Sequence, residues 1–272
     1  MLRNAKRFIH ASVRRNIMRQ LLHDIEFKET HSRLGLKINS HLNGLDKSKK
    51  DDKQKILELC QIGKLLATYF NDFEITQVIE KPDFIISNGQ TQFGLEHELI
   101  LDSKAKAQEG FYENICEKVE VNLENDPSVP NVLVNLHLKD NLSFKINDKT
   151  DLITRLTELD KHFILTGELY DNDIVNNAHR MKHTQKSVNA NFGAYWQKAI
   201  TKDLILEYVS KKESKISAYR QNTKLPLWLV LIIGGVGQSS FEVNELLNIE
   251  LTTDFHKVFL YEDFDNKLYE LK

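Results

Sequence analysis

The chain has 272 residues, which suits one large domain or a core with an added lobe. It is 41% hydrophobic and 28% charged, and 37 basic against 39 acidic side chains give a formal net charge of −2. This balance excludes a protein that binds nucleic acid through an overall positive charge, so any basic surface must be local. No run of about 18 apolar residues is present, so no transmembrane helix and no membrane partner are predicted. The two cysteines, Cys60 and Cys116, lie in apolar helical patterns and predict a reducing, cytoplasmic compartment.

The N-terminal segment is basic and amphipathic. Its six basic side chains before the first acid are Arg3, Lys6, Arg7, Arg14, Arg15 and Arg19. This composition also describes an organelle transit peptide, but an apolar stripe continues into the domain and favours a basic surface helix over 8–28. Residues 33–53 are polar and interrupted by Gly and Asn, which predicts a loop or linker. Residues 1–50 are therefore predicted to be a helical extension with a linker, and 51–272 one domain with an insertion near 171–200.

Helical and strand patterns alternate along the rest of the chain. Helices are predicted over 53–70, 103–124, 151–160, 203–219 and 239–248. Strands are predicted over 76–80, 83–87, 92–101, 132–138, 162–165, 227–233, 257–263 and 267–271. The segment 171–200 is rich in Asn and His and is predicted to be irregular or strand-bearing. This alternation predicts an α/β domain with a mixed central sheet.

Residues 81–100 place three carboxylates around a predicted hairpin. A two-residue Asn-Gly turn in its middle would pair Asp83 with Gly94. Paired residues share a face of a sheet, as do residues two apart on one strand. Asp83, Glu96 and Glu98 are therefore predicted to emerge on one side, with Gly94 leaving a notch beside them.

Three acids on one face repel one another, and a bound divalent cation would offset that repulsion. Magnesium, or manganese in its place, takes carboxylate and water oxygens together with substrate phosphates. Such a cation lowers the pKa of a bound water and stabilises charge on a phosphoryl oxygen. The alternative is a solvated outer face of an edge hairpin. The low strand propensity of Glu, Asp and Gly favours the metal site.

A lysine interrupts the apolar stripe of the predicted 203–219 helix. The stripe comprises Ile205, Tyr208, Val209, Ile216 and Tyr219. Lys212 falls in its middle and Lys215 at its edge, whereas Lys211 faces further away. A buried lysine needs a partner, and one that reaches the acidic face would orient a water or stabilise a phosphate oxygen. The alternative is that Lys212 packs its stem and keeps its ammonium group in water.

Together these features resemble the PD-(D/E)XK nuclease superfamily, whose motif is Pro-Asp at a strand start, a hairpin, and Glu-x-Lys on the next strand. The matching residues are Pro82-Asp83 and Glu96-His97-Glu98. The resemblance covers roughly residues 55–235. It implies a restriction-endonuclease-like core of order α-β-β-β-α-β, in which Asp83 and Glu96 hold the metal.

The chain departs from the motif at Glu98, which occupies the lysine position. Some members of the superfamily supply this lysine from a nearby helix, a part that Lys212 or Lys215 would play here. The second helix of the fold often offers another acid, for which Glu58 is the candidate, although an exposed Glu beside apolar neighbours fits the pattern as well.

The resulting hypothesis is a metal-dependent phosphodiesterase. It would cleave DNA, with RNA as the alternative substrate, and a homodimer is compatible with it. Asp83, Glu96 and Glu98 would hold the metal, and Lys212 or Lys215 would assist the water. The alternative hypothesis is an inactive module of the same fold that binds nucleic acid or a protein through the basic helix and the insertion.

Ten histidines raise the question of zinc. His179 and His183 are four residues apart and would share a helix face, but no Cys or acid has matching spacing, which favours a polar surface. Under the nuclease hypothesis the basic and aromatic residues of this segment would instead contact phosphates and bases. These residues are Arg180, Lys182, His183, Lys186 and Trp196.

Overall fold

The computed structural model describes residues 29–139, 142, 145–191, 197–235, 237–244 and 249–272. The chain forms two units. Unit 1 comprises 1–100, 199–234 and 242–272, and unit 2 comprises 101–198 and 235–241. Unit 2 thus spans a longer segment than the insertion predicted near 171–200. The helix predicted over 8–28 lies outside the described residues.

Unit 1 is built on a six-stranded mixed sheet, which confirms the predicted α/β class. The strand order is β1 (Glu74–Val78), β2 (Phe84–Ser87), β3 (Gln92–Leu99), β8 (Leu227–Ile233), β10 (Lys257–Glu262) and β11 (Lys267–Glu270). The first three strands form an antiparallel meander, β3, β8 and β10 run parallel, and β11 returns antiparallel. All seven residues of β8 are buried, as expected of a parallel strand covered on both faces.

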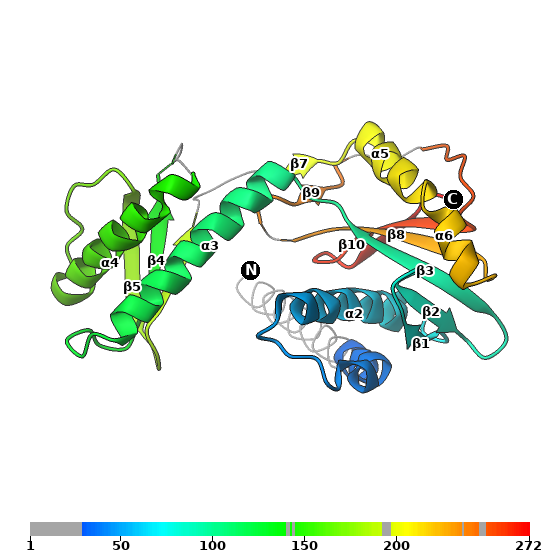
Figure 1. Ribbon diagram of the computed structural model, residues 1–272, viewed down its shortest axis with the longest axis horizontal. Coiled ribbons are helices and arrows are strands. Elements are labelled where there is room, and N and C mark those ends of the chain that lie inside the picture. Colours follow the sequence, from blue (N-terminus) through cyan, green and yellow to red (C-terminus); the bar gives the residue numbers. More distant parts are fainter. Residues whose placement is uncertain (1–28, 140–141, 143–144, 192–196, 236, 245–248) are drawn as a thin grey trace, which may run out of the picture. The chain divides into compact units, whose positions relative to one another are not determined.

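Helices cover both faces of this sheet (Figure 1). On one face lies α2 (Lys50–Tyr69), whose apolar residues share a core with β2, β3, β8 and β10. A helix over 29–42 packs on α2 and replaces the linker predicted from residue 33. A Cβ at Gly63 of α2 would lie 2.4 Å from the Ile38 side chain, so glycine permits this close approach.

The other face of the sheet carries two short helices, α5 (Lys202–Glu213) and α6 (Ile216–Asn222). They replace the single helix predicted over 203–219. The Thr201 side chain accepts a hydrogen bond from the Leu204 amide and begins α5. The buried residues of the pair include Ile205, Val209, Lys212, Ile216 and Tyr219. The predicted stripe therefore faces the sheet even though the helix is interrupted at 214–215.

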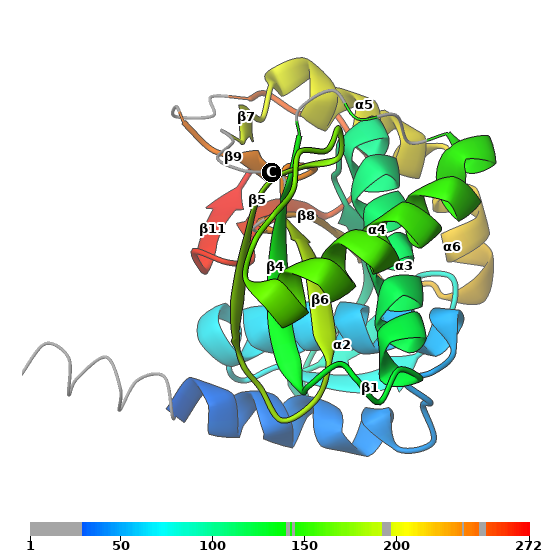
Figure 2. The same ribbon diagram turned by 90° about the vertical axis from the view of Figure 1, so that its left-hand side faces the viewer.

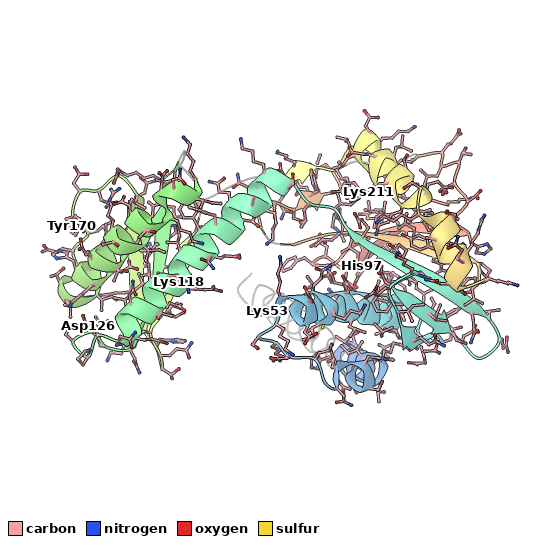
Figure 3. The ribbon with its side chains drawn as sticks, viewed as in Figure 1. Lys53, His97, Lys118, Asp126, Tyr170 and Lys211 are labelled. Atoms are coloured by element: carbon pink, nitrogen blue, oxygen red, sulfur yellow. The ribbon has the colours of Figure 1, made fainter. Side chains whose placement is uncertain are left out.

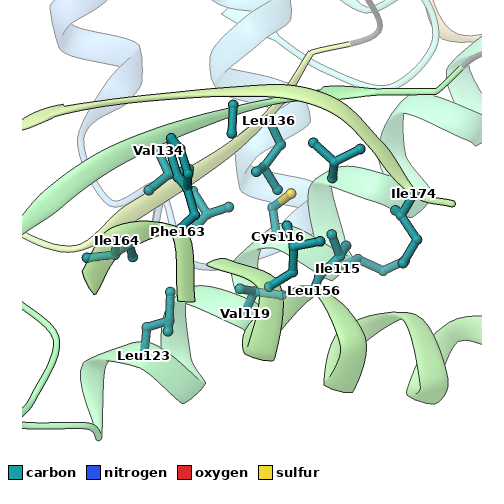
Figure 4. Close-up of a cluster of buried hydrophobic side chains, with 14 of the residues drawn as sticks. Ile115, Cys116, Val119, Leu123, Val134, Leu136, Leu156, Phe163, Ile164 and Ile174 are labelled. Carbon is teal, nitrogen blue, oxygen red and sulfur yellow. The ribbon is translucent and has the colours of Figure 1, made fainter. Parts of the chain in front are cut away.

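Unit 2 combines a three-stranded sheet with helices on one face (Figure 2). Its elements are α3 (Ser103–Glu124), β4 (Val132–Leu138), a 3-10 turn (Ile146–Asp148), α4 (Lys149–Thr166), β5 (Val175–Lys182) and β6 (Ser187–Asn191), with strand order β5-β4-β6. The apolar sides of α3, α4 and β4 form its core, which Figure 4 shows around Cys116.

Two local predictions in the second half of the chain differ from the structure, and a third agrees with it. The strand predicted over 162–165 is the last turn of α4, which ends at Gly167 with φ 84°. A helix was predicted over 239–248, but residues 241–242 form the short strand β9 (Phe241–Glu242). This strand pairs with β7 (Lys198–Ala199). The segment 171–200 carries strands β5 and β6, as its composition allowed.

Candidate active site

The β2–β3 hairpin has a different register from the predicted one. Phe84 pairs with Leu95 instead of Phe93, because the turn runs over four residues from Asn88 to Thr91. The side-chain oxygen of Asn88 accepts hydrogen bonds from the Thr91 amide and hydroxyl and so stabilises the wider turn. The register shift is two residues, so every side chain keeps its predicted face.

This register brings the first two carboxylates together. Continued one residue beyond β2, it places Asp83 opposite Glu96 rather than opposite Gly94. The His97 amide donates a hydrogen bond of 2.8 Å to Asp83 Oδ2. Burial raises the pKa of Asp83 to about 7, and the neighbouring charge of Glu96 contributes to the rise. Asp83 and Glu96 therefore form an adjacent acid pair on the face covered by α5 and α6.

Lys212 reaches this acid pair from α5 and is 5% exposed. Its Nζ lies 2.6 Å from Glu96 Oε1, 2.7 Å from Glu98 Oε2 and 3.2 Å from the carbonyl oxygen of His97. These three acceptors match the three donors of an ammonium group. Burial lowers the pKa of Lys212, but the hydrogen bonds and charges of the two glutamates outweigh it and raise the pKa above its ordinary value. The snorkelling alternative is therefore wrong.

Glu98 is held by two lysines. Its Oε1 lies 2.8 Å from the Nζ of Lys211, and its Oε2 contacts Lys212. Burial raises the pKa of Glu98, but these hydrogen bonds outweigh burial and lower it overall. The prediction that Lys211 faces away is wrong, because its long side chain reaches Glu98 from the exposed side of α5. Figure 3 labels Lys211 on α5 and His97 on β3.

Two buried polar atoms beside Lys212 are left without a hydrogen-bond partner in the described part of the chain. They are Glu96 Oε2 and the hydroxyl of Tyr219 on α6. Burial, followed by hydrogen bonding to Glu96 and then by its charge, raises the pKa of Tyr219 well above its ordinary value, so the hydroxyl lies close to Glu96. Native structures rarely leave such groups unsatisfied, so the second oxygen of Glu96 is available to the nearby hydroxyl of Tyr219 or to a cation.

The notch predicted at Gly94 is filled. A Cβ there would lie 2.7 Å from Pro82 Cγ and 2.8 Å from Leu227 Cδ2. The space beside the strand is thus taken up by apolar packing and is not open to a ligand. Glycine is required at this position because no side chain would fit.

Two other predicted site residues lie apart from this cluster. Glu58 is on α2, on the other face of the sheet, and accepts a 2.9 Å hydrogen bond from Gln54. Its charge contributes to the raised pKa of Asp83 less than burial and Glu96 do. Lys215 is exposed at the start of α6. Among the described residues, the lysines that contact Glu96 or Glu98 are Lys211 and Lys212, not Lys215.

His97, between the two glutamates, belongs to the opposite face. Its Nε2 lies 2.9 Å from Gln61 Oε1 of α2. Burial, followed by the charge of Lys212, lowers the pKa of His97 to about 4, so the ring is neutral at pH 7. The ring is part of the α2 interface and not of the acidic cluster.

A divalent cation fits part of the predicted ligand set. Within the described ranges, no three His, Cys, Asp or Glu side chains are gathered to hold a metal. The predicted set of Asp83, Glu96, Glu98 and Glu58 is therefore not assembled. The Asp83–Glu96 pair with its free oxygen remains, and magnesium usually takes only one or two carboxylates, with waters and substrate phosphates completing its shell.

Two of the basic residues of unit 2 that were predicted to contact nucleic acid instead form hydrogen bonds with backbone carbonyl groups of the same unit. Arg180 donates to the carbonyl oxygens of Phe163 and Ile164 in the last turn of α4. Lys186 donates to the carbonyl oxygens of Leu123, at 2.7 Å, and Asp126, at 2.8 Å, at the end of α3. Both therefore satisfy helix C-termini.

The histidines of this segment form no helical zinc motif. His179 lies on β5 and His183 just beyond the end of that strand, both exposed. Their four-residue spacing therefore does not place them on a helix face, and both side chains lie on the surface. Trp196 lies outside the described residues.

No family model, curated protein or solved structure matches the chain. Among the helices of the described residues, none combines the length and apolar character required to cross a bilayer.

Proposed function

We propose that the chain is a metal-dependent nuclease that hydrolyses phosphodiester bonds of DNA. The observation that carries the proposal is the meeting of the Asp83–Glu96 acid pair, which has an unpartnered oxygen, with the buried cation of Lys212. Magnesium or manganese is the proposed cofactor.

The arrangement of unit 1 supports this proposal. Its elements follow in the order α2, β1, β2, β3, α5, α6 and β8 once unit 2 is set aside. With α5 and α6 counted as one interrupted helix, this order is compatible with the α-β-β-β-α-β order implied by the resemblance to the PD-(D/E)XK superfamily. The lysine that is missing at position 98 is supplied from α5, as the resemblance also implies.

Each residue has a distinct part in the proposed reaction. Asp83 and Glu96 would hold the cation, which when bound lowers the pKa of a water and neutralises charge on the scissile phosphate. Lys212 donates hydrogen bonds at the same place and is suited to orient the attacking water or to stabilise a phosphate oxygen. The packing of α5 and α6 over the sheet keeps Lys212 in this position.

The proposal is tested with the full chain and three substrates, namely supercoiled plasmid, single-stranded DNA and RNA, in Mg²⁺ or Mn²⁺. We expect cleavage that EDTA abolishes, and a decrease of at least about 100-fold in Glu96→Ala. Glu207→Gln, on the exposed side of α5, serves as the control. Absence of cleavage by the natural sequence, or unchanged cleavage by Glu96→Ala, would contradict the proposal.

The same experiment decides between catalysis and the inactive binding module. Salt-sensitive DNA binding that needs no metal and gives no turnover would support the module. The missing lysine at position 98 would favour the inactive module, but Lys212 brings a lysine to the same carboxylates and so argues against it.

A further inference from the structure

The two glutamates of the cluster differ in their partners. Each oxygen of Glu98 is taken by a lysine, Oε1 by Lys211 and Oε2 by Lys212. Glu96 has one oxygen on Lys212 and one without a partner. Glu98 is thus already saturated with positive charge, whereas Glu96 still has an oxygen to offer.

A cation on Glu96 and the ammonium group of Lys212 compete for the same carboxylate. Their positive charges repel each other across a site that is shielded from water, where this repulsion is strong. Lys212 can give up its contact with Glu96 and remain in place only if other acceptors hold it. Glu98 Oε2 and the His97 carbonyl oxygen are those acceptors.

We propose that Glu98 is a positioning residue that holds Lys212 beside the acid pair when the cation is bound, and that it is not a metal ligand. Lys211 completes this arrangement, because it occupies the oxygen that would otherwise be free to turn toward the cation. This inference rests on the proposed nuclease function and extends it, since it explains how a glutamate takes the place of the motif lysine. Partners that orient a functional group in this way typically affect activity or metal affinity 10- to 100-fold.

The test is a double-mutant cycle on Mn²⁺ affinity measured by titration calorimetry, which is independent of cleavage. Glu98→Gln in the natural chain should weaken Mn²⁺ binding about tenfold, because Lys212 then relies on Glu96. Lys212→Met should tighten binding. Adding Glu98→Gln to Lys212→Met should change the affinity by less than about twofold.

The cycle separates this inference from the proposed function. If Glu98 is a metal ligand, Glu98→Gln weakens binding equally with and without Lys212, which overturns the inference and leaves the nuclease proposal in place. If the natural chain binds no Mn²⁺, both fall. Lys202→Met on the first turn of α5 is the matched lysine control.

A charge-exchanged variant tests the inference where Lys212→Met fails to fold. Glu98→Lys combined with Lys212→Glu keeps one cation and one anion in the pair. We expect it to bind Mn²⁺ and to cleave DNA at least about tenfold faster than either single variant. An exchanged variant that folds but does not bind Mn²⁺ would show that position 98 must carry a carboxylate for the metal, against the inference.

Discussion

Each unit of the molecule buries a carboxyl group, and the two groups have opposite surroundings. In unit 1, Glu96 is 4% exposed and lies against the ammonium group of Lys212. In unit 2, Asp160 on α4 is 0% exposed, and within the described part of the chain neither of its oxygens has a hydrogen-bond partner. Burial raises the pKa of Asp160 to about 8, so at pH 7 most of it is protonated.

The difference shows that burial of an acid does not by itself mark a functional site. A buried carboxylate remains charged only where a cation compensates for the water it has lost. Without such a partner the acid becomes neutral and behaves as a poorly satisfied polar group of the core. In the cluster of unit 1 the ammonium group of Lys212 supplies such a cation to Glu96 and Glu98, whereas Asp83, whose pKa burial raises to about 7, is only partly charged at pH 7.

The largest expected effect is the loss of Lys212. Lys212→Met leaves Glu96 buried without its cation and should lower the free energy of unfolding by about 3–5 kcal/mol. Urea unfolding of the metal-free protein measures this. Lys202→Met, exposed on the same helix, should change it by less than about 0.5 kcal/mol. Similar stabilities for the two variants would show that the cluster is not charge-paired.

Removing the charge of Asp160 should produce an intermediate effect that depends on pH. The pKa of Asp160 in the folded chain lies above the value of 3.8 for a free Asp side chain. Between these values the folded state holds a proton that the unfolded state has lost, so stability is highest at low pH and falls as the pH rises toward about 8. The slope is on the order of 1 kcal/mol per pH unit at most.

Asp160→Asn has no such titration and should therefore be more stable than the natural chain at pH 8 by about 1–3 kcal/mol, with a smaller difference at pH 5. Urea unfolding at the two pH values checks this. Glu158→Gln, exposed on the same helix, provides the control. A natural chain with the same pH dependence as Asp160→Asn would mean that Asp160 is charged in the folded state and has found a partner.

The smallest effect concerns Tyr219, whose hydroxyl lies beside the charged cluster without a partner. Tyr219→Phe should leave the free energy of unfolding unchanged or raise it by less than about 1 kcal/mol, because no hydrogen bond is lost. Thermal unfolding without metal is the measurement. A clear loss of stability would show that the hydroxyl donates to Glu96, whose free oxygen would then no longer support the metal site.

The sequence predicted the elements of the sheet and the face of each acid more reliably than their pairing. The boundaries of α3, β4 and β8 agree with the periodic patterns. The hairpin register was wrong because an Asn-Gly pair is usual in a two-residue turn, whereas the Asn88 side chain builds a four-residue one here. Each side chain still lies on the predicted face of the sheet, because a shift of two residues preserves the alternation of faces along the strand.

The lysines of the site were predicted in part. Lys212 interrupted an apolar stripe, which is a visible signal, and the structure places it on the acids. Lys211 gave no such signal, because the direction of its Cβ says little about where a four-carbon side chain ends. Leu34, Ile38 and Leu42 are spaced four apart and could have revealed the helix over 29–42, but Gly and Asn nearby suggested a linker.

The position of unit 2 between β3 and α5 has a consequence for synthesis on the ribosome. Glu96 and Lys212 are 116 positions apart, and nearly all of unit 2 is made between them. At translation rates of roughly 5–20 residues per second, the acids of β3 emerge roughly 6–23 s before their lysine. During that time β3 also lacks its neighbour β8, so the nascent chain carries an unpaired strand edge and uncompensated negative charge while most of unit 2 is synthesised.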